Sequence, residues 1–120
     1  AADVMAGFTK VATPFGVNML AQTAAVAALQ ERPAVDRRVA TIVKEREKLV
    51  RALRALEWNG PEPQGNFVWF NLGEEAERFA RFCAEEKIVV RTFADEGVRV
   101  TVAEPQASLR LVRAYKKFRA

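Results

Sequence analysis

An arginine in the middle of a predicted strand is the most informative residue of this sequence. In Gly97–Val102 three valines alternate with Arg99 and Thr101, and this period of two is typical of a strand with one buried face. The guanidinium of Arg99 would project from a rigid element, where its planar set of donors suits bidentate binding of a carboxylate. An arginine on a solvated sheet face gives the same pattern, so this strand alone leaves both interpretations open.

Two further polar residues lie next to predicted strands. Arg91 follows the β-forming run Ile88–Val90, so we expect its side chain to project from the end of a strand, at a site or simply at the surface. Asn66 begins the apolar run Asn66–Leu72, where its amide either contributes to a site or satisfies nearby backbone groups. These two residues and Arg99 are the candidate site residues.

The composition narrows the possible chemistry. The chain has 120 residues, half of them hydrophobic, which is enough for one domain with a core of its own. It has no histidine and one cysteine, Cys83, so neither an internal disulfide nor a zinc site is expected, and a reduced, cytoplasmic environment is favoured. We expect Cys83 to fill the core, and Trp58 and Trp69 to be packing anchors. The net charge of +4 is spread over helix faces, so nucleic-acid binding is not expected. The most apolar run, Val17–Leu29, is too short to cross a membrane and contains Asn18 and Gln22, so no membrane span is expected.

The hydrophobic periodicity predicts an α+β fold. Two helices come first, and a β-α-β-β-α unit follows, with a three-stranded, mostly antiparallel sheet covered by helices. The first strand is apolar on both faces, so it is predicted to be central. Residues 1–33 are expected to form an interdomain segment with an Ala-rich helix, and residues 34–120 a small domain. The expected elements are helices over 17–30, 34–56, 74–86 and from 105 onward, and strands over 66–72, 88–93 and 98–102.

Four motifs in order give the chain a family resemblance. The motifs are Pro14-Phe15-Gly16-Val17-Asn18-Met19-Leu20-Ala21-Gln22, Gln64-Gly65-Asn66-Phe67-Val68, Ile88-Val89-Val90-Arg91 and Gly97-Val98-Arg99-Val100-Thr101-Val102. Together they resemble the family motifs P-F-x-V-N-x-L-A-Q, Q-A-N-F-V, I-V-V-R and G-V-R-V-T-V in the C-terminal part of a class II, histidinol-phosphate type aminotransferase of pyridoxal-phosphate fold type I. Their residues are most similar to those of the histidinol-phosphate and aromatic aminotransferases.

The resemblance implies a function and roles for the three candidates. Such enzymes use pyridoxal 5'-phosphate to transfer an amino group from an amino acid to a 2-oxo acid. Arg99 matches the arginine that binds the substrate α-carboxylate, Arg91 the one that contacts the distal group, and Asn66 a residue near the carboxylate. The partners implied are these small substrates, the large domain of the same protein and a second copy in a homodimer. Histidinol phosphate and aromatic amino acids both remain possible substrates.

The sequence also departs from the family pattern. Lys10 lies too close to Pro14 to match the lysine that binds the cofactor, so we expect a piece of a longer protein, inactive by itself, with the cofactor bound mainly by the large domain. Ala103-Glu104 replaces the usual glycine-containing pair and is expected to bring an acid near Arg99. Two alternatives stay open: a free-standing basic α/β module that binds a partner or nucleic acid, and the small domain of a related decarboxylase.

Overall fold

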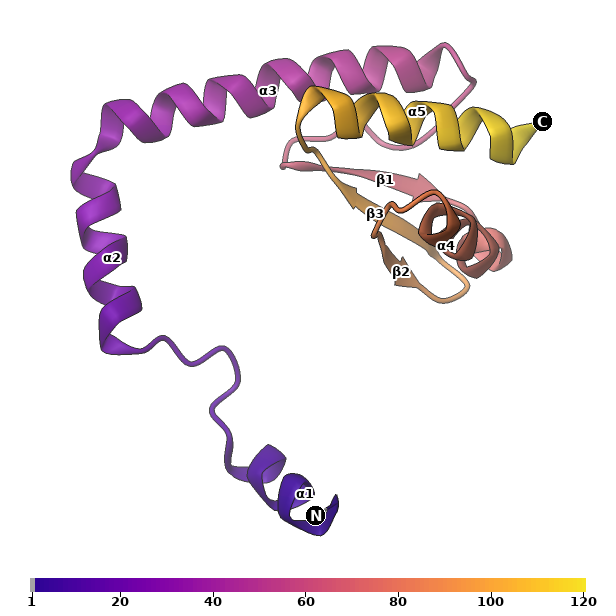
Figure 1. Ribbon diagram of the computed structural model, residues 1–120. Helices are drawn as coiled ribbons and strands as arrows, with labels where there is room; N and C mark the ends of the chain where they lie inside the picture. Colours follow the sequence, from indigo (N-terminus) through magenta and orange to yellow (C-terminus); the bar gives the residue numbers. More distant parts are fainter. Residues whose placement is uncertain (1) are drawn as a thin grey trace. The chain divides into compact units, whose positions relative to one another are not determined.

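The computed structural model describes residues 2–120, whose helices and strands are drawn in Figure 1. The chain divides into two units, Ala1–Asp36 and Arg37–Ala120, which are described separately below. The predicted domain boundary between residues 33 and 34 stays a prediction.

The first unit contains helices α1, Ala2–Val11, and α2, Met19–Gln30. The sequence did not lead us to expect α1, because no capping residue marks its start, although its composition favours a helix. Asn18 begins α2 as its N-cap: its side-chain oxygen accepts a hydrogen bond from the amide of Ala21 at 2.9 Å. All described residues of α1 and α2 are exposed.

Helix α3 spans Arg32–Arg54 and so begins two residues before its predicted start. The Arg32-Pro33 pair does not separate two helices by a loop. Glu31 alone ends α2, and Pro33 is accommodated in the first turn of α3, where the missing amide hydrogen is not needed. The last three turns of α3 contribute Leu49, Val50 and Leu53 to the core.

The second unit is α+β, as predicted. Its sheet consists of β1, Phe67–Asn71, β2, Arg91–Phe93, and β3, Gly97–Thr101, in the order β1-β3-β2, with both pairs antiparallel. A 3-10 turn, η1 (Gly73–Glu75), leads into α4, Ala76–Glu85, and the chain ends in α5, Pro105–Arg119.

The prediction that the first strand is central was wrong. β1 is an edge strand, and β3 is central. Val68 and Phe70 of β1 are buried in the core, whereas Phe67 is 37% exposed and Trp69 is half-buried.

Strand β2 is also shorter than predicted, and Arg91 begins it rather than following its end. The amide of Ile88 donates to the carbonyl of Cys83 at 2.8 Å and so closes the end of α4. Lys87 has a positive φ of 60° in the same turn. Because the backbone of Ile88 is used to end the helix, strand pairing starts only three residues later.

One face of the sheet packs on the core. Val68, Phe70, Val98 and Val100 point to this inner face and are buried with side chains from α3, α4 and α5. Phe70 lies at its centre, with its ring 5.2 Å from that of Phe79 and 5.1 Å from that of Tyr115. The helices thus cover the inner face, and the opposite face of the sheet carries the candidate arginines.

Candidate functional site

The strand register places the candidate arginines on the outer face of the sheet. In an antiparallel sheet, residues that are partners across strands point to the same side. Arg99 of β3 is partnered by Trp69 on β1 and by Arg91 on β2. The outer face, by this alternation, comprises Phe67, Trp69, Asn71, Arg91, Phe93, Gly97, Arg99 and Thr101.

Arg91 and Arg99 are direct cross-strand partners. Their Cα atoms are therefore about 4.5–5.5 Å apart, as in any antiparallel pair. Like charges placed directly opposite each other destabilise a sheet. No carboxylate forms an ion pair with either arginine among residues 2–120. The arrangement is electrostatically unfavourable by itself and favours an anion on this face.

Each guanidinium lies over an aromatic ring. The Cζ atom of Arg99 is 5.4 Å from the ring centre of Phe67, and that of Arg91 is 5.2 Å from the ring centre of Phe93. Both distances are within the range of cation–π attraction. An aromatic face attracts the charge without occupying the guanidinium N–H groups, which stay available to a ligand.

Trp69, the partner of Arg99 on β1, is a third aromatic side chain on the outer face. Its ring meets that of Phe93 edge-on, with centres 5.4 Å apart, although β3 lies between the two strands that carry them. Gly97 makes this contact possible. A Cβ atom at Gly97 would lie 2.7 Å from Cζ2 of Trp69 and 2.2 Å from the carbonyl oxygen of Phe70.

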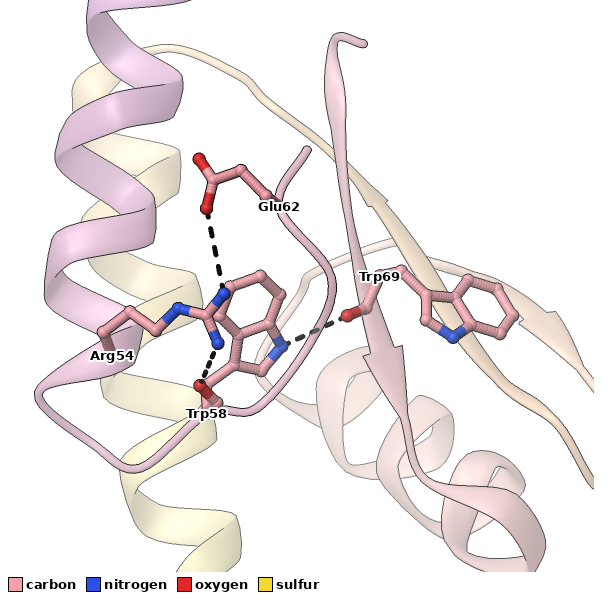
Figure 2. Close-up of polar contacts among 4 residues, drawn as sticks. All are labelled: Arg54, Trp58, Glu62 and Trp69. Carbon is pink, nitrogen blue, oxygen red and sulfur yellow. Dashed lines mark hydrogen bonds and ion pairs between the residues drawn. The ribbon is translucent and has the colours of Figure 1, made fainter. Parts of the chain in front are cut away.

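The backbone of Trp69 is tied to the turn that follows α3. The indole nitrogen of Trp58 donates to the Trp69 carbonyl at 3.2 Å, while the indole of Trp69 points away from Trp58 (Figure 2). Arg54 lies 4.6 Å over the Trp58 ring and donates to its carbonyl at 3.0 Å. Glu62 lies 3.8 Å from the same guanidinium. Trp58 is 2% exposed, which confirms it as a packing anchor, and through this bond it fixes the middle of β1.

Asn66 lies at the start of β1, and its side chain is exposed. Its carbonyl accepts from the amide of Val102 at 2.8 Å, which extends the β1–β3 pairing by one step. Just before it, Arg46 of α3 donates to the carbonyls of Gln64 and Gly65 at 2.7 and 2.8 Å. Arg46 and Asn66 line a shared cavity of about 190 Å³. The structure thus pairs Arg91 with Arg99 on the outer face, whereas Asn66 precedes β1 and lines a cavity with residues of α3.

Two other sequence expectations concern Glu104 and Cys83. Glu104 is the residue before α5 and lines a pocket with Thr41 and Ile42 of α3, and no ion pair links it to Arg99 within residues 2–120. Cys83 is fully buried, which confirms it as a core residue. Burial, and secondarily the charge of Glu86, raises the pKa of the Cys83 thiol to about 11.

The outer face suits an anionic ligand and has no side chain that could bind pyridoxal phosphate covalently, because no lysine is among its residues. Residues 2–120 contain no group of three or more metal-ligating side chains. None of the helices described is long and apolar enough to cross a membrane. The chemistry that this face can perform is the binding and orientation of a carboxylate or phosphate.

A helix-covered, three-stranded antiparallel sheet that presents two adjacent arginines is the class of small domain expected from the sequence motifs. The family model "Aminotransferase class I and II" matches residues 1–114. The chain therefore belongs to the class I and II aminotransferase family, which decides against an unrelated basic binding module.

The relatives are named for one activity. The chain is 46% identical over 116 residues to the aromatic amino acid aminotransferase of Streptomyces coelicolor, a match covering 97% of this chain and 32% of that protein. The chain is also 46% identical over 118 residues to the enzyme of the same name from Thermobifida fusca, a match covering 96% of this chain and 33% of that protein. The chain thus spans about a third of the length of these relatives.

Solved structures show the same fold. An aminotransferase-like protein from Burkholderia pseudomallei superposes with a TM-score of 0.75 and 22% identity, over 100% of this chain and 38% of that one. The histidinol-phosphate aminotransferase of Clostridium acetobutylicum gives a TM-score of 0.69 and 22% identity, over 97% and 37% of the two chains.

Sequence reasoning missed the aromatic side chains around the arginines. The sequence indicated Trp69 as a packing anchor, because no basic residue flanks it at strand spacing, and Phe67 and Phe93 only as parts of predicted strands. The register brings Arg99 of β3 close to Phe67 of β1, whereas Arg91 lies two residues before Phe93 on β2 itself. A signal was present in Gly97, whose missing side chain marks a close approach across the sheet, but its partner could not be named without the register.

Proposed function

We propose that this chain is the substrate-binding small domain of an aminotransferase that acts on aromatic amino acids or histidinol phosphate with a 2-oxo acid as acceptor. The observation that carries the proposal is the cross-strand pairing of Arg91 with Arg99 on the outer face of the sheet. The family membership and the names of the relatives support it. The family pattern further implies a cytoplasmic homodimer, and both features stay predictions.

Arg99 is proposed to bind the substrate α-carboxylate. It lies in the central strand, and it is half-buried, so the side chain is held in place by both neighbouring strands. Its planar donors match the two oxygens of a carboxylate, and this pair gains strength when water is excluded around it. Every amino-acid substrate presents this group, so Arg99 would serve all of them.

Arg91 is proposed to contact the far end of the substrate. It is exposed and lies on the edge strand β2, one strand away from Arg99. A phosphate offers it several charged acceptor oxygens, whereas a phenyl ring offers only its face. Asn66 is proposed to assist at the carboxylate end. Pyridoxal phosphate, when bound, supplies the electron sink for the reaction, and its ligands belong to parts of the family fold other than this outer face.

The test of Arg99 uses the full-length enzyme with Arg99→Lys, which keeps the charge and removes the planar set of donors. We expect kcat/KM to fall by the equivalent of about 2–4 kcal/mol for every amino-acid donor, as for a desolvated charge pair. Arg113→Lys, at an exposed position of α5, is the matched control and should leave the kinetics unchanged. A loss for Arg99→Lys no larger than for Arg113→Lys would refute the assignment.

The test of Arg91 compares two donors. Arg91→Ala should penalise histidinol phosphate far more than phenylalanine, because only the phosphate forms charge-assisted bonds with the guanidinium. The measurement is kcat/KM for both donors in wild type and variant. Equal losses for the two donors would mean that Arg91 binds the carboxylate or supports the fold.

A further inference from the structure

The guanidinium groups of Arg91 and Arg99 lie toward opposite ends of the outer face. Phe67 is the partner of Thr101, whereas Phe93 is the partner of Gly97. Thr101 and Gly97 are four residues apart on β3, which corresponds to about 13 Å along the strand. Arg99 lies over the Phe67 ring and Arg91 over the Phe93 ring, so the guanidiniums of two directly paired residues diverge.

We infer that Phe67 and Phe93 are positioning residues that hold the two guanidiniums apart, so that Arg99 meets the carboxylate end of the substrate and Arg91 its distal end. This inference rests on the proposed function. Without the two rings, the strand pairing would leave the flexible guanidinium groups of Arg91 and Arg99 next to each other on adjacent strands, where they repel. With them, each charge has its own aromatic face, and one small anion is not shared between both arginines.

Aromatic rings suit this positioning role better than acidic residues would. A carboxylate beside Arg99 or Arg91 would occupy the N–H donors and cancel the charge that attracts the substrate. A phenyl face attracts the cation through its quadrupole and leaves all donors available. Trp69 reinforces the arrangement from the side, because its edge-on contact at 5.4 Å fixes the Phe93 ring.

The experiment measures kcat and KM of the full-length enzyme carrying Phe67→Leu or Phe93→Leu, with phenylalanine and histidinol phosphate as donors. Phe67→Leu should lower kcat/KM about two- to fivefold for both donors, which is the size of an exposed cation–π contact. Phe93→Leu should lower it by a similar factor for histidinol phosphate only. Phe67→Tyr and Phe93→Tyr retain the ring and should restore wild-type values.

The matched control is Phe118→Leu, which removes a ring 4.2 Å from the Cζ atom of Arg78 in α4. It deletes the same type of contact away from the outer face, so it should lower the melting temperature and leave kcat/KM unchanged. The inference is wrong if Phe67→Leu and Phe93→Leu act like Phe118→Leu, or if the tyrosine variants fail to restore activity. If Arg99→Lys itself has no effect, the proposed function fails; if Arg99→Lys is impaired and the phenylalanine variants are not, only the positioning inference fails.

Discussion

Replacing Gly97 by alanine should destabilise the fold through a steric conflict at the start of the central strand β3. The added Cβ would lie 2.2 Å from the carbonyl oxygen of Phe70 and 2.7 Å from Cζ2 of Trp69. The first contact is with backbone, so a change of side-chain rotamer cannot relieve it. The strands β1 and β3 must separate locally, and the Trp69 ring must also move unless this separation relieves its contact.

The expected cost follows from overpacking of a well-packed site. Insertions of single methyl or methylene groups typically cost about 1–3 kcal/mol, and the backbone contact at Gly97 places this change at the upper end. With a urea dependence of about 1–3 kcal/mol per molar, a cost of about 3 kcal/mol should lower the unfolding midpoint by about 1–3 M. The fluorescence of Trp69 should change as well, because its half-buried indole is displaced.

The matched control is Gly7→Ala in α1. A Cβ at Gly7 would meet no atom within 4 Å, and alanine favours the helix, so no destabilisation is expected. Urea unfolding of both variants, followed by circular dichroism and tryptophan fluorescence, checks the prediction. A Gly97→Ala variant whose unfolding midpoint equals that of Gly7→Ala would refute the close approach of Trp69 over β3.

Two further predictions concern stability. The Cys83 thiol has its pKa raised by burial, and secondarily by Glu86, above the ordinary 9.0 to about 11, so the folded state keeps the proton longer than the unfolded state. The contribution of this protonated thiol to stability should be complete below pH 9 and disappear as the pH rises toward 11. The measurement is the difference in unfolding free energy between wild type and Cys83→Ala across this pH range. A difference that does not change with pH would contradict the prediction. Arg46→Ala should cost about 1 kcal/mol, because two carbonyls lose a charged donor at a partly exposed site, whereas Arg38→Ala on the same helix should cost almost nothing. Equal melting temperatures for these two arginine variants would show that the Arg46 bonds do not stabilise the turn before Asn66.

From α2 onward, the sequence by itself determined the helices and strands and their order. The alternation of valines with Arg99 and Thr101 requires a strand with one buried face, and the short turn before Gly97 requires a hairpin with the preceding strand. Both are local signals, carried by residues close together in the chain. The motifs around Asn66, Arg91 and Arg99 likewise indicated the family, because their spacing along the chain needs no knowledge of contacts.

Only the tertiary structure decided which strand is central and what surrounds the arginines. β1 pairs with β3 across an intervening helix and strand, and nothing in the local pattern of Phe67–Asn71 specifies that register. The register alone brings Phe67 beside Arg99 and lets Trp69 reach Phe93 over Gly97. The start of β2 at Arg91 was similarly hidden, since the Ile88 amide is used to close α4. The sequence could name the arginines, but their separation and their aromatic supports depend on long-range pairing that one-dimensional periodicity does not contain.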